Sequence, residues 1–190
     1  MFAYKNKYYL IIESIKDLNI KNIKRYNKFI VIYRNKSKIE KISDLHKFRK
    51  DCKIKQVKFF VANDTNLATL IKADGLYISS YNKSFKNLCF RRKNFSFIGS
   101  AHNYREIELK KKQGCEIILV SKLYKVGYDP KSSYMGITKF NKKFLFDKKI
   151  IPLGGITICN LNSLKNTNSE GFALLSEVKK KPAKIFSRLF

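Results

Sequence analysis

The stretch KIIPLGGITICNLNSLKNTNSEGFALLSEV, residues 149–178, indicates the fold of the chain more clearly than any other. It holds two continuous apolar runs, residues 150–153 and 172–175, with a glycine pair and a short helical pattern between them. Such runs are typical of parallel strands that are buried on both faces. In a (β/α)8 barrel, the loops after the last two strands commonly hold a phosphate. We therefore interpret Gly154-Gly155 and Ser176, which follow the two runs, as a phosphate-binding pair of loops rather than as ordinary turns.

The rest of the chain repeats this alternation of apolar runs and helical patterns. Strands are predicted at residues 8–12, 28–33, 57–62, 75–78, 95–99, 116–120, 150–153 and 172–175. Helical patterns are predicted at residues 15–23, 39–48, 66–73, 104–113, 137–146 and 182–189, with a short helix inside the polar loop 81–92. No linker divides the chain. The pattern predicts one compact TIM barrel, a (β/α)8 fold with shortened helices, over residues 1–190.

The composition excludes several classes of protein. Hydrophobic residues make up 44% of the 190 residues, which excludes a disordered chain. The four cysteines lie far apart, and the chain has only two histidines. This argues against a zinc site and a disulfide framework, and predicts a reducing, cytoplasmic location. No apolar run approaches the roughly 20 residues of a membrane helix, so no membrane partner is expected.

The formal net charge of +27 would attract nucleic acid without sequence preference. However, the lysines are spread along the whole chain, together with many Ile, Asn, Tyr and Phe residues. That combination is typical of AT-rich coding sequence. Because neither a stacking motif nor a recognition helix accompanies the charge, we favour compositional drift over a nucleic-acid partner.

Polar or glycine residues follow many of the predicted strands. They are Arg34, Lys36, Asn63, Asp64, Ser100, Gly155 and Ser176. In a (β/α)8 barrel the carboxyl ends of the strands converge on one face, where active sites lie. We therefore expect these residues to form one site.

Four segments resemble a known family, the thiamine phosphate synthases and their TenI-like thiazole tautomerase relatives. VANDTNLATLIKADGLYI (residues 61–78) is similar to the family pattern V-N-D-x-x-x-x-A-x-x-x-x-A-D-G-x-H-[IL]. IGSAHNYREIELKKKQGCEII (residues 98–118) is similar to G-x-S-x-H-x-x-x-E-x-x-x-A-x-x-x-G-A-D-Y-[IV]. LGGIT with Asn160 resembles GGI-[TN]-x-x-N, and GFALLSEV (residues 171–178) resembles the last motif. Four motifs in the right order and spacing make the resemblance specific.

The resemblance implies a transferase of thiamine biosynthesis. In such an enzyme an aminopyrimidine methyl pyrophosphate loses pyrophosphate, and the nitrogen of a thiazole phosphate captures the resulting cation. By resemblance, Arg34, Lys36, Asn63 and Ser100 would bind the pyrophosphate. Asp64 would be the first carboxylate ligand of Mg²⁺, which prefers oxygen ligands.

The thiazole phosphate would lie at the other end of the site. There the resemblance assigns the phosphate cradle to Gly155, Leu175 and Ser176. The lysine of the family's motif after the sixth strand has no direct counterpart in SKLYKVGYDPKSS (residues 121–133), which also lacks its threonines. Three lysines are candidate replacements: Lys122, Lys125 and, in our assignment, Lys131.

Two further departures concern the pyrophosphate end. Ile32 stands where the family has Gln, and Asn82 stands at the position of the second metal carboxylate. Asn82 removes one charge from the metal site. The resemblance therefore implies Mg²⁺ binding that is weakened or lost.

Two other functions stay open. One is a TenI-like tautomerase, in which His102 would transfer protons, although the same histidine motif occurs in synthases. The other is a catalytically degenerate barrel that binds a phosphorylated ligand or nucleic acid. The sequence does not indicate an oligomeric state.

Overall fold

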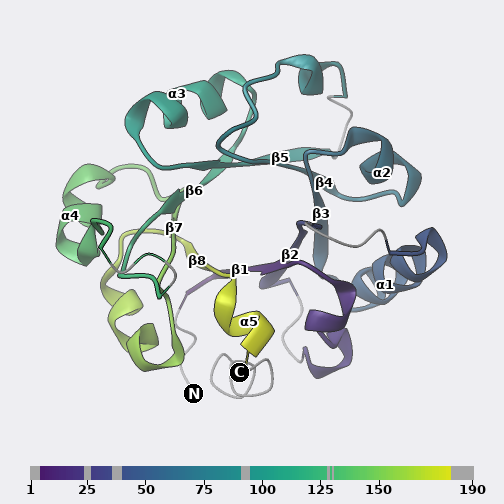
Figure 1. Cartoon of the computed structure of the whole chain (residues 1–190), viewed down its shortest axis with the longest axis horizontal. Coiled ribbons are helices and arrows are strands. Elements are labelled where there is room, and N and C mark those ends of the chain that lie inside the picture. Colours follow the sequence, from purple (N-terminus) through teal and green to yellow (C-terminus); the bar gives the residue numbers. More distant parts are fainter. Residues whose placement is uncertain are drawn as a thin grey trace.

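A closed barrel of eight parallel strands forms the centre of the protein (Figure 1). The computed structural model describes residues 5–23, 27–35, 40–90, 95–127, 129 and 131–180. The strands are β1 (Lys7–Ile12), β2 (Phe29–Tyr33), β3 (Lys58–Ala62), β4 (Gly75–Ile78), β5 (Ser96–Ala101), β6 (Ile117–Ser121), β7 (Ile150–Leu153) and β8 (Gly171–Leu174). Each strand pairs with the next along the chain, and β8 closes the ring against β1, with Tyr9 opposite Ala173. The predicted (β/α)8 barrel is confirmed.

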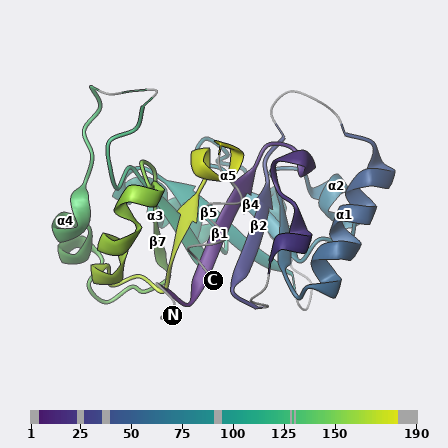
Figure 2. The same cartoon turned by 90° about the horizontal axis from the view of Figure 1, so that it is seen from below.

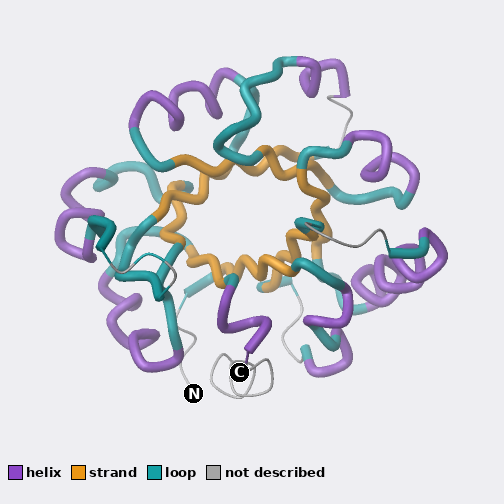
Figure 3. The backbone as a smooth tube through the Cα atoms, viewed as in Figure 1, coloured by secondary structure: helices purple, strands orange, loops and turns teal. Residues whose placement is uncertain are grey.

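Short helical segments surround the strands, which appear as the inner ring of Figure 3. The α-helices are α1 (Ile42–Ile54), α2 (Thr65–Leu70), α3 (Tyr104–Lys112), α4 (Gly136–Lys143) and α5 (Ser176–Lys180). The 3-10 helices are η1 (Ile15–Asp17), η2 (Ile20–Asn22), η3 (Lys86–Phe90) and η4 (Ile158–Asn166). The predicted shortening of the helices is therefore confirmed for the described residues. The predicted helix at residues 182–189 lies outside them.

The predicted helix at residues 15–23 is wrong. The chain forms two separate 3-10 turns there, η1 and η2, because polar side chains compete for the backbone donors. Ser14 and Asp17 form a capping box around η1, and the Asn19 side chain accepts from the Lys21 N–H at 3.0 Å. Side chains of this kind offer the backbone partners that end a helix. Three apolar residues of this segment, Leu18, Ile20 and Ile23, are nevertheless buried.

Alternation along the strands divides the apolar residues into two cores. In β2, Phe29, Val31 and Tyr33 belong to the core between strands and helices, whereas Ile30 and Ile32 fill the inside of the barrel. The other interior residues are Tyr9, Ile11, Phe60, Tyr77, Ile98, Leu119, Ile151 and Ala173. Because side chains fill the barrel, a ligand can reach only its rim.

The rim at the carboxyl ends of the strands carries the longest connections. Figure 2 shows the loop between β6 and α4 extending from the same end of the barrel at which α5 lies. Within the described residues, no helix combines the length and the apolar character needed to cross a bilayer.

Candidate functional site

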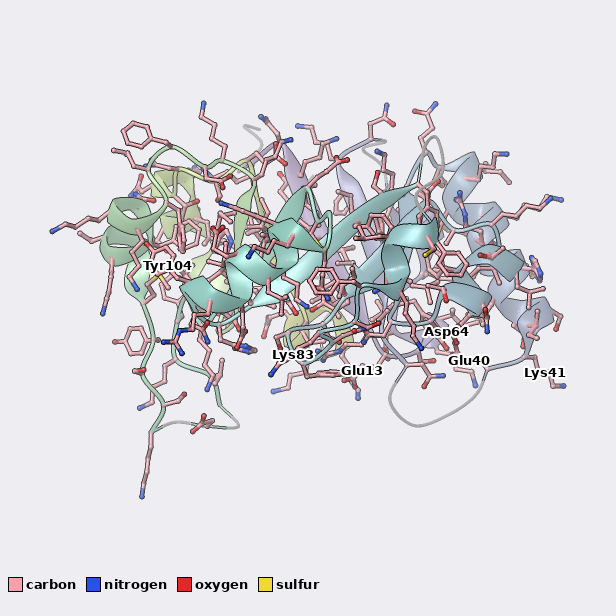
Figure 4. The ribbon with its side chains drawn as sticks, turned by 90° about the horizontal axis from the view of Figure 1, so that it is seen from above. Glu13, Glu40, Lys41, Asp64, Lys83 and Tyr104 are labelled. Atoms are coloured by element: carbon pink, nitrogen blue, oxygen red, sulfur yellow. The ribbon has the colours of Figure 1, made fainter. Side chains whose placement is uncertain are left out.

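The candidate site lies at the rim of the barrel, at the inward-facing positions where the strands end. Following Ile30 and Ile32, the next inward position after β2 is Arg34, and the corresponding position after β1 is Glu13. In β5 the same alternation places Ser100 inward after Ile98, and Ser100 is buried. Figure 4 shows Glu13 and Asp64 at this same end of the molecule. The barrel therefore brings residues predicted from separate strands to one rim.

Arg34 provides positive charge at the rim. Its Nη2 lies 3.6 Å from Glu13 Oε1, and Lys179 Nζ, from α5, lies 3.2 Å from Glu13 Oε2. Two cations thus share one carboxylate. Arg34 Nε is buried and has no hydrogen-bond partner among the described residues, and a buried donor without a partner is costly. This arrangement suits an anion. Lys36, which was predicted to assist Arg34, lies outside the described residues.

Tyr77 lies just below the part of the rim that carries Ser100. Its ring fills the barrel interior below the rim, where it is 1% exposed. Burial raises the pKa of Tyr77, while a hydrogen bond with Ser100 and the charge of Arg34 act in the opposite direction. Two residues predicted for the site, Ser100 and Arg34, therefore both act on the pKa of the Tyr77 phenol.

Asn63 is the centre of a hydrogen-bond network after β3. Its φ of 57° is left-handed, a conformation that Asn tolerates better than most residues. Its Oδ1 accepts from the Ser79 N–H at 3.0 Å and from Asn82 Nδ2 at 3.1 Å. Its Nδ2 donates to Tyr81 Oη at 3.0 Å and also to Ser79 Oγ. Asn63 therefore holds the loop after β4 against the end of β3.

The two residues predicted to bind Mg²⁺ have other partners. One Asp64 oxygen accepts from the Leu67 N–H at 2.9 Å and so caps α2. The Asn82 Oδ1 accepts from the Ser84 N–H at 3.0 Å. No group of three or more His, Cys, Asp or Glu residues that could hold a metal ion occurs in the described part of the chain. One capping carboxylate and one bonded amide carry less negative charge than the two carboxylates of the family pattern, and weakened Mg²⁺ binding stays a prediction.

The glycine pair after β7 is packed against the loop after β6. Gly154 and Gly155 have φ values of +92° and +68°. A Cβ on Gly155 would lie 2.5 Å from the Tyr124 carbonyl oxygen and 2.4 Å from that of Lys125. Only glycine can combine this conformation with so close an approach. The pair is therefore more than a tight turn, because it lets the loops after β6 and β7 meet.

The second half of the predicted phosphate cradle follows β8. Strands β7 and β8 are neighbours, with Leu153 opposite Ala173. Leu175 packs against the interior core, and Ser176 begins α5 and is exposed. The barrel thus brings the loops that carry Gly155 and Ser176 to the same side of the rim.

The lysines after β6 differ in their surroundings. Lys122 Nζ donates to Asp129 at 2.6 Å and to Ser132 at 2.7 Å, and these contacts lower the pKa of the Asp129 carboxyl. Lys122 therefore stabilises its own loop. Lys131 lies on the same loop and is exposed, which leaves its predicted role in phosphate binding untested.

His102 contacts the start of α3. Its Nδ1 lies 3.1 Å from Glu106 Oε2, and its backbone N–H donates to the same oxygen at 2.8 Å. Its side chain is 52% exposed. Asn103 caps the helix beside it. These contacts give His102 a structural role at a helix terminus and do not support the tautomerase interpretation.

Four residues of the rim were missed from the sequence: Glu13, Ser79, Tyr81 and Lys179. The signal for Glu13 was present, because it is the first polar residue after the apolar run YYLII. The others had no such signal, since their roles depend on partners from other strands and helices.

Comparisons with known proteins bear on the family and the fold of the chain. The family model described as thiamine monophosphate synthase matches residues 13–178. A thiamine-phosphate synthase from Clostridioides difficile is 25% identical over 150 residues, which cover 77% of this chain and 71% of that protein. Among solved structures, a thiamine phosphate pyrophosphorylase from Pyrococcus furiosus matches with a TM-score of 0.67 and 16% identity, covering 98% of each chain. A 3-keto-L-gulonate-6-phosphate decarboxylase from Vibrio cholerae matches with a TM-score of 0.55 and 10% identity, covering 98% of this chain and 99% of that one. The two structural matches show the fold alone.

Proposed function

Because the chain belongs to the thiamine monophosphate synthase family, we propose that it joins an aminopyrimidine methyl pyrophosphate to a thiazole phosphate. The products are thiamine phosphate and pyrophosphate. The observation that carries the proposal is the buried Arg34 Nε, a donor without a partner among the described residues, at a rim that also holds Asn63 and Ser100. These are three of the residues that the family resemblance assigns to the pyrophosphate.

The proposed reaction needs charge neutralisation and alignment. The bond between the pyrimidine methylene carbon and the pyrophosphate oxygen breaks, and the oxygen keeps the electron pair. The thiazole nitrogen then forms a bond with that carbon. Arg34 would stabilise the charge that develops on the leaving pyrophosphate, as would Lys36. The Asn63 network would fix the position of the pyrophosphate oxygens.

The thiazole phosphate would bind on the other side of the rim. Backbone N–H groups of the loops at Gly155 and Ser176 would hold it, with Leu175 beneath and Lys131 adding positive charge. The ring nitrogen would then face the methylene carbon. Mg²⁺, if bound through Asp64, would help to neutralise pyrophosphate, but no step of the proposed mechanism depends on it.

The test is synthesis of thiamine phosphate from both substrates by the purified protein, with and without Mg²⁺. Arg34→Met should lower the rate about 100-fold or more, because it removes a charge that acts on the leaving group. Arg105→Met is the matched control, since it removes an exposed arginine at the start of α3. Absence of product over a wide range of enzyme concentrations would exclude synthase activity.

A second candidate is a barrel that binds a phosphorylated ligand without catalysis. The observation that favours it is the use of Asp64 as a helix cap and of Asn82 as a partner of Asn63. Thermal unfolding distinguishes the two functions. A synthase site should be stabilised by pyrophosphate and by thiazole phosphate, whereas a binding barrel should respond to the thiazole phosphate alone.

A further inference from the structure

Lys110 of α3 is a fully buried lysine. Its side chain is 0% exposed, as is that of Gln113 directly after the helix. Lysine is almost never fully buried unless its nitrogen has partners. Lys110 Nζ donates to the Asn82 carbonyl oxygen at 2.7 Å and to Gln113 Oε1 at 2.8 Å. Both acceptors are neutral, so the lysine is not half of a buried ion pair with either of them.

The lysine stem passes directly over β5. A Cβ on Gly99 would lie 2.9 Å from Cβ and Cγ of Lys110 and 3.0 Å from Cys115 Sγ. A side chain at position 99 would therefore displace the lysine. Gly99 makes room for the stem and so helps the ammonium group reach the loop after β4.

The Asn82 carbonyl is the point at which α3 holds this loop. Besides Lys110, it accepts from Gln113 Nε2 at 3.0 Å, and the same Nε2 donates to the Ser84 carbonyl at 2.8 Å. On its other side, the Asn82 side chain donates to Asn63 Oδ1 at 3.1 Å. Asn82 therefore links the buried lysine to Asn63, through its backbone carbonyl on one side and its side-chain amide on the other.

Two departures from the family pattern meet in this contact. The pattern that matches residues 98–118 has Ala at the position of Lys110, and the pattern after β4 has Asp at the position of Asn82. A small residue at 110 could not reach the loop. In this chain the two positions are in direct contact, through Lys110 Nζ and the Asn82 carbonyl oxygen.

We propose that Lys110 is a positioning residue for the pyrophosphate end of the site. By holding the Asn82 carbonyl, it directs the Asn82 amide onto Asn63 and fixes the orientation of the Asn63 side chain. The identity of the ligand, pyrophosphate, rests on the proposed function, whereas the hydrogen-bond network is independent of it.

The test compares Lys110→Met with Lys112→Met. The first keeps the apolar stem over Gly99 and removes the donor, and the second removes an exposed lysine from the same helix. Pyrophosphate and thiazole phosphate affinities are measured by calorimetry, and the side-chain amide resonances of Asn63 and Asn82 by NMR. Lys110→Met should weaken pyrophosphate binding about tenfold or more, the effect of losing a hydrogen bond of this kind. It should leave thiazole phosphate binding within about twofold of wild type.

The outcomes separate the two claims. Equal pyrophosphate affinities for Lys110→Met and wild type would overturn the positioning role, as would a parallel loss for both ligands. If wild type binds neither ligand, the proposed function fails. The amide resonances then decide the inference, because unchanged Asn63 and Asn82 signals in Lys110→Met would contradict it. If Lys110→Met does not fold, pyrophosphate must shift the Lys110 Nζ resonance of wild type, and absence of that shift would overturn it.

Discussion

Gly155 offers the sharpest test of how the predicted phosphate cradle is built. Its φ of +68° is left-handed, and a Cβ there would lie 2.4 and 2.5 Å from two backbone carbonyl oxygens of the loop after β6. Gly155→Ala therefore combines two costs. The left-handed conformation costs alanine about 1–2 kcal/mol. Relief of the overlap requires the backbone to move, which adds about 1–3 kcal/mol.

Substitution of Gly136 measures the conformational cost without the steric overlap. Its φ of +71° is nearly the same, but a Cβ there would meet nothing within 4 Å. Gly136→Ala should therefore lose only the conformational part, about 1 kcal/mol after the smaller entropy of the unfolded chain is included. A Cβ on Gly127 would also meet nothing within 4 Å, and no positive φ is present there. Gly127→Ala should stay within about 0.5 kcal/mol of wild type.

The measurement is the free energy of unfolding from urea denaturation of the three variants and wild type. Gly155→Ala should be less stable than Gly136→Ala by about 1–3 kcal/mol. It should also bind thiazole phosphate more weakly, because the loops after β6 and β7 would separate. Equal losses of stability in the two variants would refute the close packing of these loops and with it the geometry of the cradle.

Three further predictions concern other parts of the molecule. A thiol reagent at pH 8 should modify the two exposed cysteines quickly and the two buried ones only after unfolding. Burial raises the pKa of the two buried thiols to about 12, so they stay protonated at this pH. Fast modification of all four cysteines would contradict the buried positions. The fast pair is Cys89 and Cys159, and the protected pair is Cys52 and Cys115. Burial acts to raise the pKa of Glu106, but hydrogen bonds from His102 and Asn103 outweigh it and lower the pKa below its ordinary value of 4.5. The ionised Glu106 carboxylate therefore stabilises the fold fully above pH 4.5, and this stabilisation is lost as pH falls through the lowered pKa. The melting temperature of Glu106→Gln should depend less on pH between pH 3 and 6 than that of wild type. Glu108→Gln, which changes an exposed carboxylate of the same helix, is the control. Asn82→Asp adds a second carboxylate to the loop that contacts Asn63, the neighbour of Asp64 in the chain. Mg²⁺ should therefore increase the thermal stabilisation by pyrophosphate more in this variant than in wild type. An equal Mg²⁺ effect in both would show that position 82 does not contribute to a metal site.

The candidate site could be predicted in part because strand ends are visible in the sequence. Arg34, Asn63 and Ser100 follow or end apolar runs, and in a parallel barrel such positions converge by geometry alone. Lys110 and Gln113 lie within a helical pattern that is otherwise rich in exposed lysines. Nothing in that local pattern distinguishes a lysine that is completely buried from one that is exposed.

The sequence by itself determined the barrel. Each strand is a short apolar run, and burial on both faces of a parallel strand needs no information about the partner residues. Only the tertiary structure decided how two other polar residues are used: Asn82 as a partner of Asn63, and Glu13 between Arg34 and Lys179. The physical reason is that burial is a property of one side chain and its periodic spacing. A hydrogen bond or ion pair instead requires two groups at a defined distance, and here the barrel brings those groups together from separate strands and helices.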